Sequence, residues 1–192
     1  MSEKNRLEAL ELLHEYTEST SLRRHAYAVE AAVRAYAREF GEDEEKWGIA
    51  GLLHDFDYEK YPTPAEHTIV GANILREKGY PEDVIYAIRA HAGYNGLDRV
   101  SLLDKALYAC DELSGFVMAV AMVRPSRKVA DVTAKSVKKK LKDKAFAKGV
   151  SREDVYRGAE ELGVDLDSHV TRVVEALSGI ATVLGLDGEP AS

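Results

Sequence analysis

GIAGLLHDFDYEKYP, residues 48–62, joins an apolar segment directly to a histidine and a carboxylate. The apolar run ends at Leu53, His54 and Asp55 follow it, and two further acids come within the next four positions. Neighbouring residues lie about 100° apart around a helix, so both side chains can reach one point only where the backbone leaves the helix. The stretch therefore predicts a helix whose end delivers His54 and Asp55 together to the interior.

Helical periodicity continues on both sides of this stretch. Thr63 as the cap, Pro64 at the first helical position and Glu66 as the capping-box acid predict one helix start. The predicted helices cover residues 22–40 with Gly41 as C-cap, 43–53, 63–78, 81–92, 101–123, a segment starting at Ser151, and 167–184. No long segment alternates with period two, so we predict an all-α fold, with residues 1–125 as the main bundle and residues 126–192 as a helical extension packed on it.

Composition limits the classes of protein that fit. The chain has 192 residues, 45% of them hydrophobic, which is enough for one domain with a full core. Its formal net charge of -7 argues against a general nucleic-acid binder. No apolar run approaches the roughly 20 residues of a spanning helix, the start lacks a signal peptide's apolar region, and Cys110 is the one cysteine. These features predict a cytoplasmic protein with no membrane partner.

Ionisable side chains lie on the apolar faces of five predicted helices: His25, His54, His67, His91 and Asp111. A single histidine on such a face is usually a core residue bonded to a carbonyl, whereas His14 and His169 have no comparable setting and are expected to be structural or exposed. A buried carboxylate without a partner is costly, so five such groups in one core indicate a common site. Imidazole nitrogens and carboxylate oxygens are the ligands of zinc, iron, manganese and nickel, and the helices of a bundle can present them to one point.

The ordered pattern of His25, the pair His54-Asp55 and Asp111 resembles the HD superfamily of metal-dependent phosphohydrolases. The resemblance covers roughly residues 20–115 and rests on HAYAVEAAVRAYA, GLLHD, HTIVGANILREKGYPEDVIYAIRAHAG and LDKALYACDEL. The long stretch supplies His67 and His91, the extra histidines of two-metal members such as diadenosine tetraphosphate hydrolases and HD-GYP phosphodiesterases. The chain reads HDFD where many relatives read HDIG, and it lacks the Gly-Tyr-Pro signature in its usual place.

The resemblance implies an HD-domain helical bundle that holds divalent transition metals, two ions of iron, manganese, nickel, zinc or cobalt, and that acts on a small-molecule phosphorylated substrate. The implied ligands are His25, His54, Asp55 and Asp111 for the first ion, and His67 and His91 with bridging Asp55 for the second. The implied activity is phosphohydrolysis of a phosphoester or nucleotide-type substrate by metal-activated water. Asp57 or Glu59 is a candidate outer-shell base, and Tyr94 and Asn95 are candidate substrate-binding residues at the pocket mouth.

Alternatives stay open at this point. The superfamily also includes diiron oxygenases, such as myo-inositol oxygenase, and a non-catalytic HD module could sense a ligand. Residues 124–149 hold ten basic and two acidic side chains, which is either a solvated face that offsets the acidic body or a surface that binds an anionic substrate. On the second interpretation, Lys138 and Lys142 form a substrate-binding edge, because they lie one helical turn apart.

Overall fold

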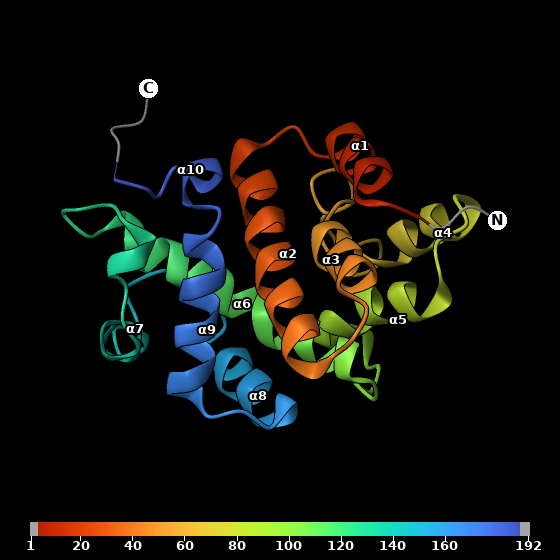
Figure 1. Cartoon of the computed structure of the whole chain (residues 1–192). Coiled ribbons are helices and arrows are strands. Elements are labelled where there is room, and N and C mark those ends of the chain that lie inside the picture. Colours follow the sequence, from red (N-terminus) through yellow and green to blue (C-terminus); the bar gives the residue numbers. More distant parts are fainter. Residues whose placement is uncertain (1–3, 189–192) are drawn as a thin grey trace.

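The computed structural model describes residues 4–188, and within them the chain forms ten α-helices and two short 3₁₀ helices (Figure 1). The all-α prediction is confirmed. The elements are α1 (Arg6–Tyr16), α2 (Thr20–Phe40), α3 (Glu44–Leu53), α4 (Ile69–Glu77), α5 (Glu82–His91), η1 (Gly93–Asn95), α6 (Leu102–Met122), η2 (Val129–Asp131), α7 (Ala134–Leu141), α8 (Arg152–Leu162), α9 (Leu166–Ser178) and α10 (Ala181–Leu184).

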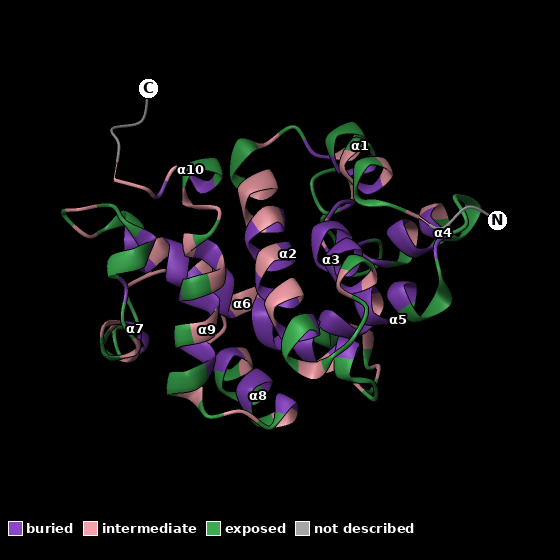
Figure 2. Cartoon of the chain, viewed as in Figure 1, coloured by how far each residue is buried: buried purple, intermediate pink, exposed green. Residues whose placement is uncertain are grey.

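The two longest helices, α2 and α6, form the centre of the bundle (Figure 1). Helix α2 packs against α3, α6 and α9, and α6 packs against α5 and α8. The buried residues of all these helices belong to one continuous apolar core, seen as the purple interior of Figure 2. Any polar side chain on the inner faces of α2, α3, α5 and α6 therefore points toward the same interior.

Close contact between α2 and α3 depends on Gly51. A Cβ atom at this position would lie 2.9 Å from the Cα atom of Glu30 on α2, so only glycine lets the two backbones approach this closely. At its N-terminal end, α3 is capped by Asp43, whose side chain accepts a hydrogen bond from the Lys46 N–H. At its other end, the helix stops at Leu53 with His54 as the C-cap, as the sequence predicts.

One predicted helix begins later than expected, and this correction matters for the site. The pattern around Thr63 predicts a helix over residues 63–78, but residues 64–68 form turns and α4 begins only at Ile69. The Thr63 hydroxyl donates to the Glu66 carboxylate at 2.7 Å instead of capping a helix. Thr68 has a left-handed backbone with φ 63°, which a helix does not allow, and its N–H donates to the buried carboxylate of Asp57.

The segment after α6 lies against the bundle. Helices α8 and α9 pack on α6, α9 also contacts α2, and the helix predicted over residues 167–184 is divided into α9 and α10 at Gly179. The domain boundary near residue 125 stays a prediction, because the apolar core is continuous across it. No helix in the described part of the chain is both long and apolar enough to cross a membrane.

Candidate metal centre

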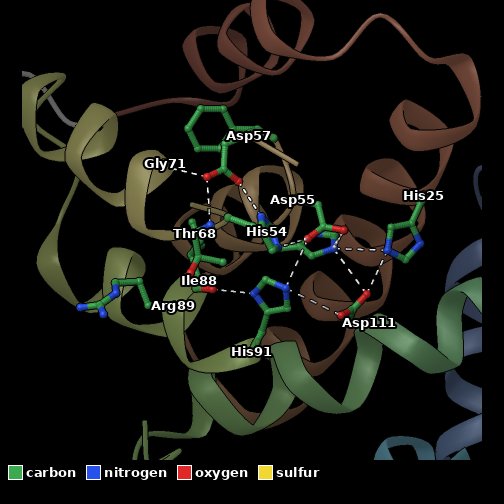
Figure 3. Close-up of polar contacts among 12 residues, drawn as sticks. His25, His54, Asp55, Asp57, Thr68, Gly71, Ile88, Arg89, His91 and Asp111 are labelled. Atoms are coloured by element: carbon green, nitrogen blue, oxygen red, sulfur yellow. Dashed lines mark hydrogen bonds and ion pairs between the residues drawn. The ribbon is translucent and has the colours of Figure 1, made fainter. Parts of the chain in front are cut away.

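Six side chains from five separate segments converge on one point. Figure 3 labels five of them, all but His67. Helix α2 supplies His25, α5 supplies His91 as its last residue, and α6 supplies Asp111. The remaining three come from the end of α3 and from the turns that follow it: His54, Asp55 and His67. The structure thus brings together all six residues that the sequence suggests as metal ligands.

Asp55 lies between two groups of histidines. Its Oδ1 atom is 3.1 Å from Nε2 of His67 and 3.3 Å from Nε2 of His91. Its Oδ2 atom is 3.5 Å from Nε2 of His54. The two carboxylate oxygens therefore face different histidines, which is the arrangement that a bridging carboxylate requires.

Asp111 forms the other end of the cluster. Its Oδ1 atom is 2.9 Å from Nε2 of His25 and 3.4 Å from Nε2 of His54, and those two nitrogens are 3.3 Å apart. Its Oδ2 atom is 4.0 Å from Nε2 of His91. Small groups of these donor atoms, such as one each from His25, His54 and Asp55, lie within 4.8 Å of one another.

Hydrogen bonds behind the cluster fix three of the imidazole rings. Nδ1 of His54 lies 2.8 Å, and Nδ1 of His91 lies 2.5 Å, from the backbone carbonyl oxygen three residues earlier in the chain. Nδ1 of His67 lies 2.8 Å from Oδ1 of Asp57. A carbonyl oxygen only accepts, so each Nδ1 of the first two carries a proton, and each Nε2 faces the centre as the nitrogen that can bind a metal once it is unprotonated. The donor set fits a divalent transition metal, since ligating histidines usually donate their other N–H to an oxygen.

The charges of the cluster also shift its proton affinities. Burial works against charging His54, but the charges of Asp55 and Asp111 outweigh it and raise the pKa of His54 well above its usual value. The pKa values of both carboxyls lie below their usual range, because the attraction of His54 and the hydrogen bonds from the other histidines outweigh the effect of burial. Burial is likewise outweighed at His67, where Asp55 and Asp57 raise the pKa to about 9. Without a cation, His54 and His67 therefore hold their protons more tightly than free imidazoles do.

The cluster is open on one side. His54 and His67 are buried, with exposed fractions of 0% and 3%. By contrast, the side chains of Asp55, His25 and Asp111 are 24%, 22% and 18% exposed. A small molecule can therefore approach along the edge formed by these three residues.

The HD-domain family model matches residues 22–115, the segment that carries all six residues of the cluster. The chain contains an HD domain. The resemblance seen in the sequence is confirmed.

Similarity to curated proteins covers the same part of the chain. Ribonuclease Y of Oleidesulfovibrio alaskensis is 32% identical over 98 residues, which are 50% of this chain and 18% of that protein. Ribonuclease Y of Cutibacterium acnes is 38% identical over 82 residues, 41% of this chain and 14% of that protein. The chain thus spans less than a fifth of the length of these relatives. No solved structure matches the chain.

The acids that follow the HD pair have structural partners. Asp57 is 1% exposed, and its Oδ2 accepts hydrogen bonds from the N–H groups of Thr68 and Gly71, both at 2.9 Å. With His67 on its other oxygen, its carboxylate is enclosed, an arrangement that favours a positioning role over the predicted role as a base. Glu59 accepts from two backbone N–H groups just before α2 and caps that loop.

Two tyrosines lie against His67 of the HD domain's cluster. Tyr94 is 53% exposed and its ring centroid is 6.3 Å from that of His67, while Tyr58 contacts the same imidazole edge-on at 5.1 Å. Burial and the charge of Asp55 raise the pKa of Tyr94 to about 12, so its hydroxyl stays protonated at neutral pH. Tyr94 therefore lies beside the cluster, and its role in substrate binding stays a prediction. Asn95, by contrast, turns its amide inward.

The structure does not bring Lys138 and Lys142 to the cluster. Helix α7 packs its apolar residues Val137 and Leu141 against the rest of the extension, and it contacts α6 and α9 but lies apart from α3, α4 and α5 (Figure 1). Lys138 forms an ion pair with Asp167 at 2.7 Å. Substrate binding by these lysines stays an untested prediction, and the arrangement supports the alternative of a solvated basic face.

Sequence reasoning missed two residues beside the cluster. Gly71 lies against Asp57, where a Cβ atom would be 2.7 Å from Oδ2, and Thr68 adopts a left-handed backbone. A glycine inside an otherwise apolar helical pattern is a signal that sequence reasoning can use. A left-handed threonine carries no such signal, because β-branched residues rarely adopt that conformation.

Proposed function

We propose that this HD domain is a metal-dependent phosphohydrolase that uses water to cleave a phosphoester or nucleotide-type substrate. The observation that carries the proposal is the division of Asp55 between two groups of histidines, with its Oδ1 and Oδ2 atoms on different nitrogens. One cluster can then hold two cations that share one carboxylate.

The ligand assignment follows the two ends of the cluster. The first ion would be held by His25, His54, Asp55 and Asp111, and the second by His67, His91 and Asp55. Two divalent ions supply polarisation of phosphoryl oxygens and a lowered pKa for water. The sharing of Asp55 is the reason to expect two ions here and not one.

The protein's own groups orient the reaction. The Nδ1 bonds of His54 and His91 hold their rings in place, so the Nε2 atoms need no rearrangement when a ligand arrives. Substrate reaches the cluster along the exposed edge of Asp55, His25 and Asp111. Beside His67, the protonated hydroxyl of Tyr94 can donate a hydrogen bond to a phosphoryl oxygen.

The proposal is tested by metal analysis of anaerobically purified protein, coupled to hydrolysis assays on a panel of phosphomonoesters, nucleotides and RNA. RNA belongs in the panel because the relatives are named ribonucleases. Asp55→Ala should lose metal and hydrolysis, whereas His14→Ala, on the exposed side of α1, should keep both. Wild-type protein that holds no metal and hydrolyses no member of the panel would end the proposal.

Added metal should also stabilise the fold. Binding contributes about 4 kcal/mol when the free metal is about 1,000-fold above its dissociation constant. The melting temperature of the wild type should therefore fall when a chelator is added, and that of Asp55→Ala should change little. An equal response in both proteins would show that Asp55 is not a metal ligand.

A further inference from the structure

The side-chain amide of Asn95 joins two segments that each carry a histidine of the cluster. Its Nδ2 atom donates to the hydroxyl oxygen of Thr68 at 2.7 Å and to the backbone carbonyl of Arg89 at 2.8 Å. Thr68 directly follows His67, and Arg89 lies in the last turn of α5, two residues before His91. Asn95 therefore ties the turn behind one histidine to the helix that carries the other.

His67 needs such a tie more than the ligands on helices do. His25, His91 and Asp111 lie on helices, whose backbone hydrogen bonds hold them, whereas His67 lies in the turns before α4. The next residue, Thr68, is fully buried and has φ 63°. Such a conformation is strained for a β-branched residue and persists only where the surroundings enforce it.

The contacts of Thr68 supply that enforcement. Its N–H donates to Asp57, whose other oxygen accepts from Nδ1 of His67, and its hydroxyl accepts from Asn95. The strained residue is thus held at its backbone by the carboxylate that orients His67, and at its side chain by the amide that reaches α5. Figure 3 shows Asp57, Thr68 and Arg89 on the side of the cluster away from His25.

We propose that Asn95 is a positioning residue that sets the distance between His67 and His91 and so tunes the site of the second ion. The inference rests on the proposed function, because it concerns the ion assigned to these two histidines. Asn95 makes no recorded contact with His25, His54 or Asp111, so the first ion should be insensitive to it. The amide is consequently a support of the metal site and not a substrate contact.

The test is a calorimetric titration of metal-free protein with Mn²⁺, comparing wild type, Asn95→Ala, Thr68→Val and the double variant. Thr68→Val keeps the branched side chain and removes only the hydroxyl. Each single variant should weaken the second Mn²⁺ by about tenfold, the low end of the effect of residues behind metal ligands, and leave the first unchanged. The double variant should be no weaker than Asn95→Ala, because both substitutions break the same bond.

Matched variants keep the test decisive. Asn73→Ala makes the same substitution at an exposed position of α4 and should bind both ions as the wild type does. Asn95→Asp has nearly the same shape but lacks the N–H donors, and it replaces Asn95→Ala if the latter does not fold. Hydrogen exchange of the Thr68 amide in metal-free protein should be faster in either Asn95 variant, a result that needs no bound metal.

Three outcomes would overturn the inference. Unchanged affinity for the second ion in Asn95→Ala shows that the amide does not position the histidines. Equal weakening of both ions shows a general effect on the fold. If the wild type binds only one Mn²⁺ and is fully active in hydrolysis, the second ion does not exist and the inference about Asn95 fails. The proposal of phosphohydrolysis would still hold, so the two proposals can fail separately.

Discussion

Replacing Gly71 with alanine tests how strongly the fold depends on the buried carboxylate of Asp57. An added Cβ atom would lie 2.7 Å from Oδ2 and 2.8 Å from Cγ of Asp57, and 3.0 Å from the Phe56 ring. All three neighbours are buried side-chain atoms, so the carboxylate cannot simply swing into solvent. It must move away from the N–H groups of Thr68 and Gly71, which it now meets at 2.9 Å.

The expected loss follows from those two bonds. Hydrogen bonds to a charged group contribute about 1.5–3 kcal/mol each, so losing both would cost about 3–6 kcal/mol. Alanine recovers about 1 kcal/mol through its higher helix propensity, because Gly71 lies inside α4. The net destabilisation is then about 2–5 kcal/mol, which lowers the melting temperature of a chain of this size by on the order of 10 °C.

Urea unfolding of metal-free protein measures this change without any contribution from bound ions. Gly149→Ala is the matched control, because a Cβ atom there would meet nothing within 4 Å and the backbone is not left-handed. Gly71→Ala should also weaken the second metal ion, since Asp57 would no longer hold Nδ1 of His67 at 2.8 Å. If Gly71→Ala and Gly149→Ala unfold at the same urea concentration, the carboxylate is not held as the structure indicates.

Further predictions concern the metal count and acid stability. His67→Ala and His91→Ala should each lower the metal content from about two ions to about one and leave the fold intact. If elemental analysis finds unchanged metal content, both residues line the pocket without binding metal. Burial lowers the pKa of His169 to about 4, below its ordinary value near 6.5, so the unfolded chain binds more protons between these values. Stability should fall by about 3 kcal/mol as pH drops from 6.5 to 4, and His169→Gln should flatten this dependence in urea titrations at several pH values.

The helices and the membership of the cluster could be predicted from sequence because both follow from local periodicity. Gly41, Asp43 and Ser101 end or cap helices where the pattern predicts it. His25 and Asp111 fall on the apolar faces of long helices, so the interior position of their side chains needs no knowledge of the fold. Periodicity fixes which residues face inward, and a bundle this small has one interior.

The support behind the cluster could not be predicted in the same way. The capping signals at Thr63 and Glu66 are locally sound, yet a buried carboxylate at Asp57 competes for the backbone N–H groups and holds the chain in turns until Ile69. Asn95 follows a helix as an ordinary loop residue would, and nothing local shows that its amide reaches back to Thr68, 27 positions earlier. Both contacts depend on tertiary structure, which local patterns do not contain.

The charge of the cluster bears on how an acidic protein would receive the anionic substrate that we propose. In the described residues, the ion-pair partners recorded for Asp55 and Asp111 are all histidines. With the histidines neutral, these two carboxylates bring a charge of -2, which two divalent cations more than balance. The surplus positive charge of the metal-loaded cluster then lies at the exposed edge, whereas the basic helix α7 lies apart from the helices that carry the cluster's histidines, and its Lys138 is paired with Asp167. Attraction for a phosphoryl group is therefore tied to metal occupancy, and the metal-free protein should bind phosphorylated ligands poorly at any ionic strength.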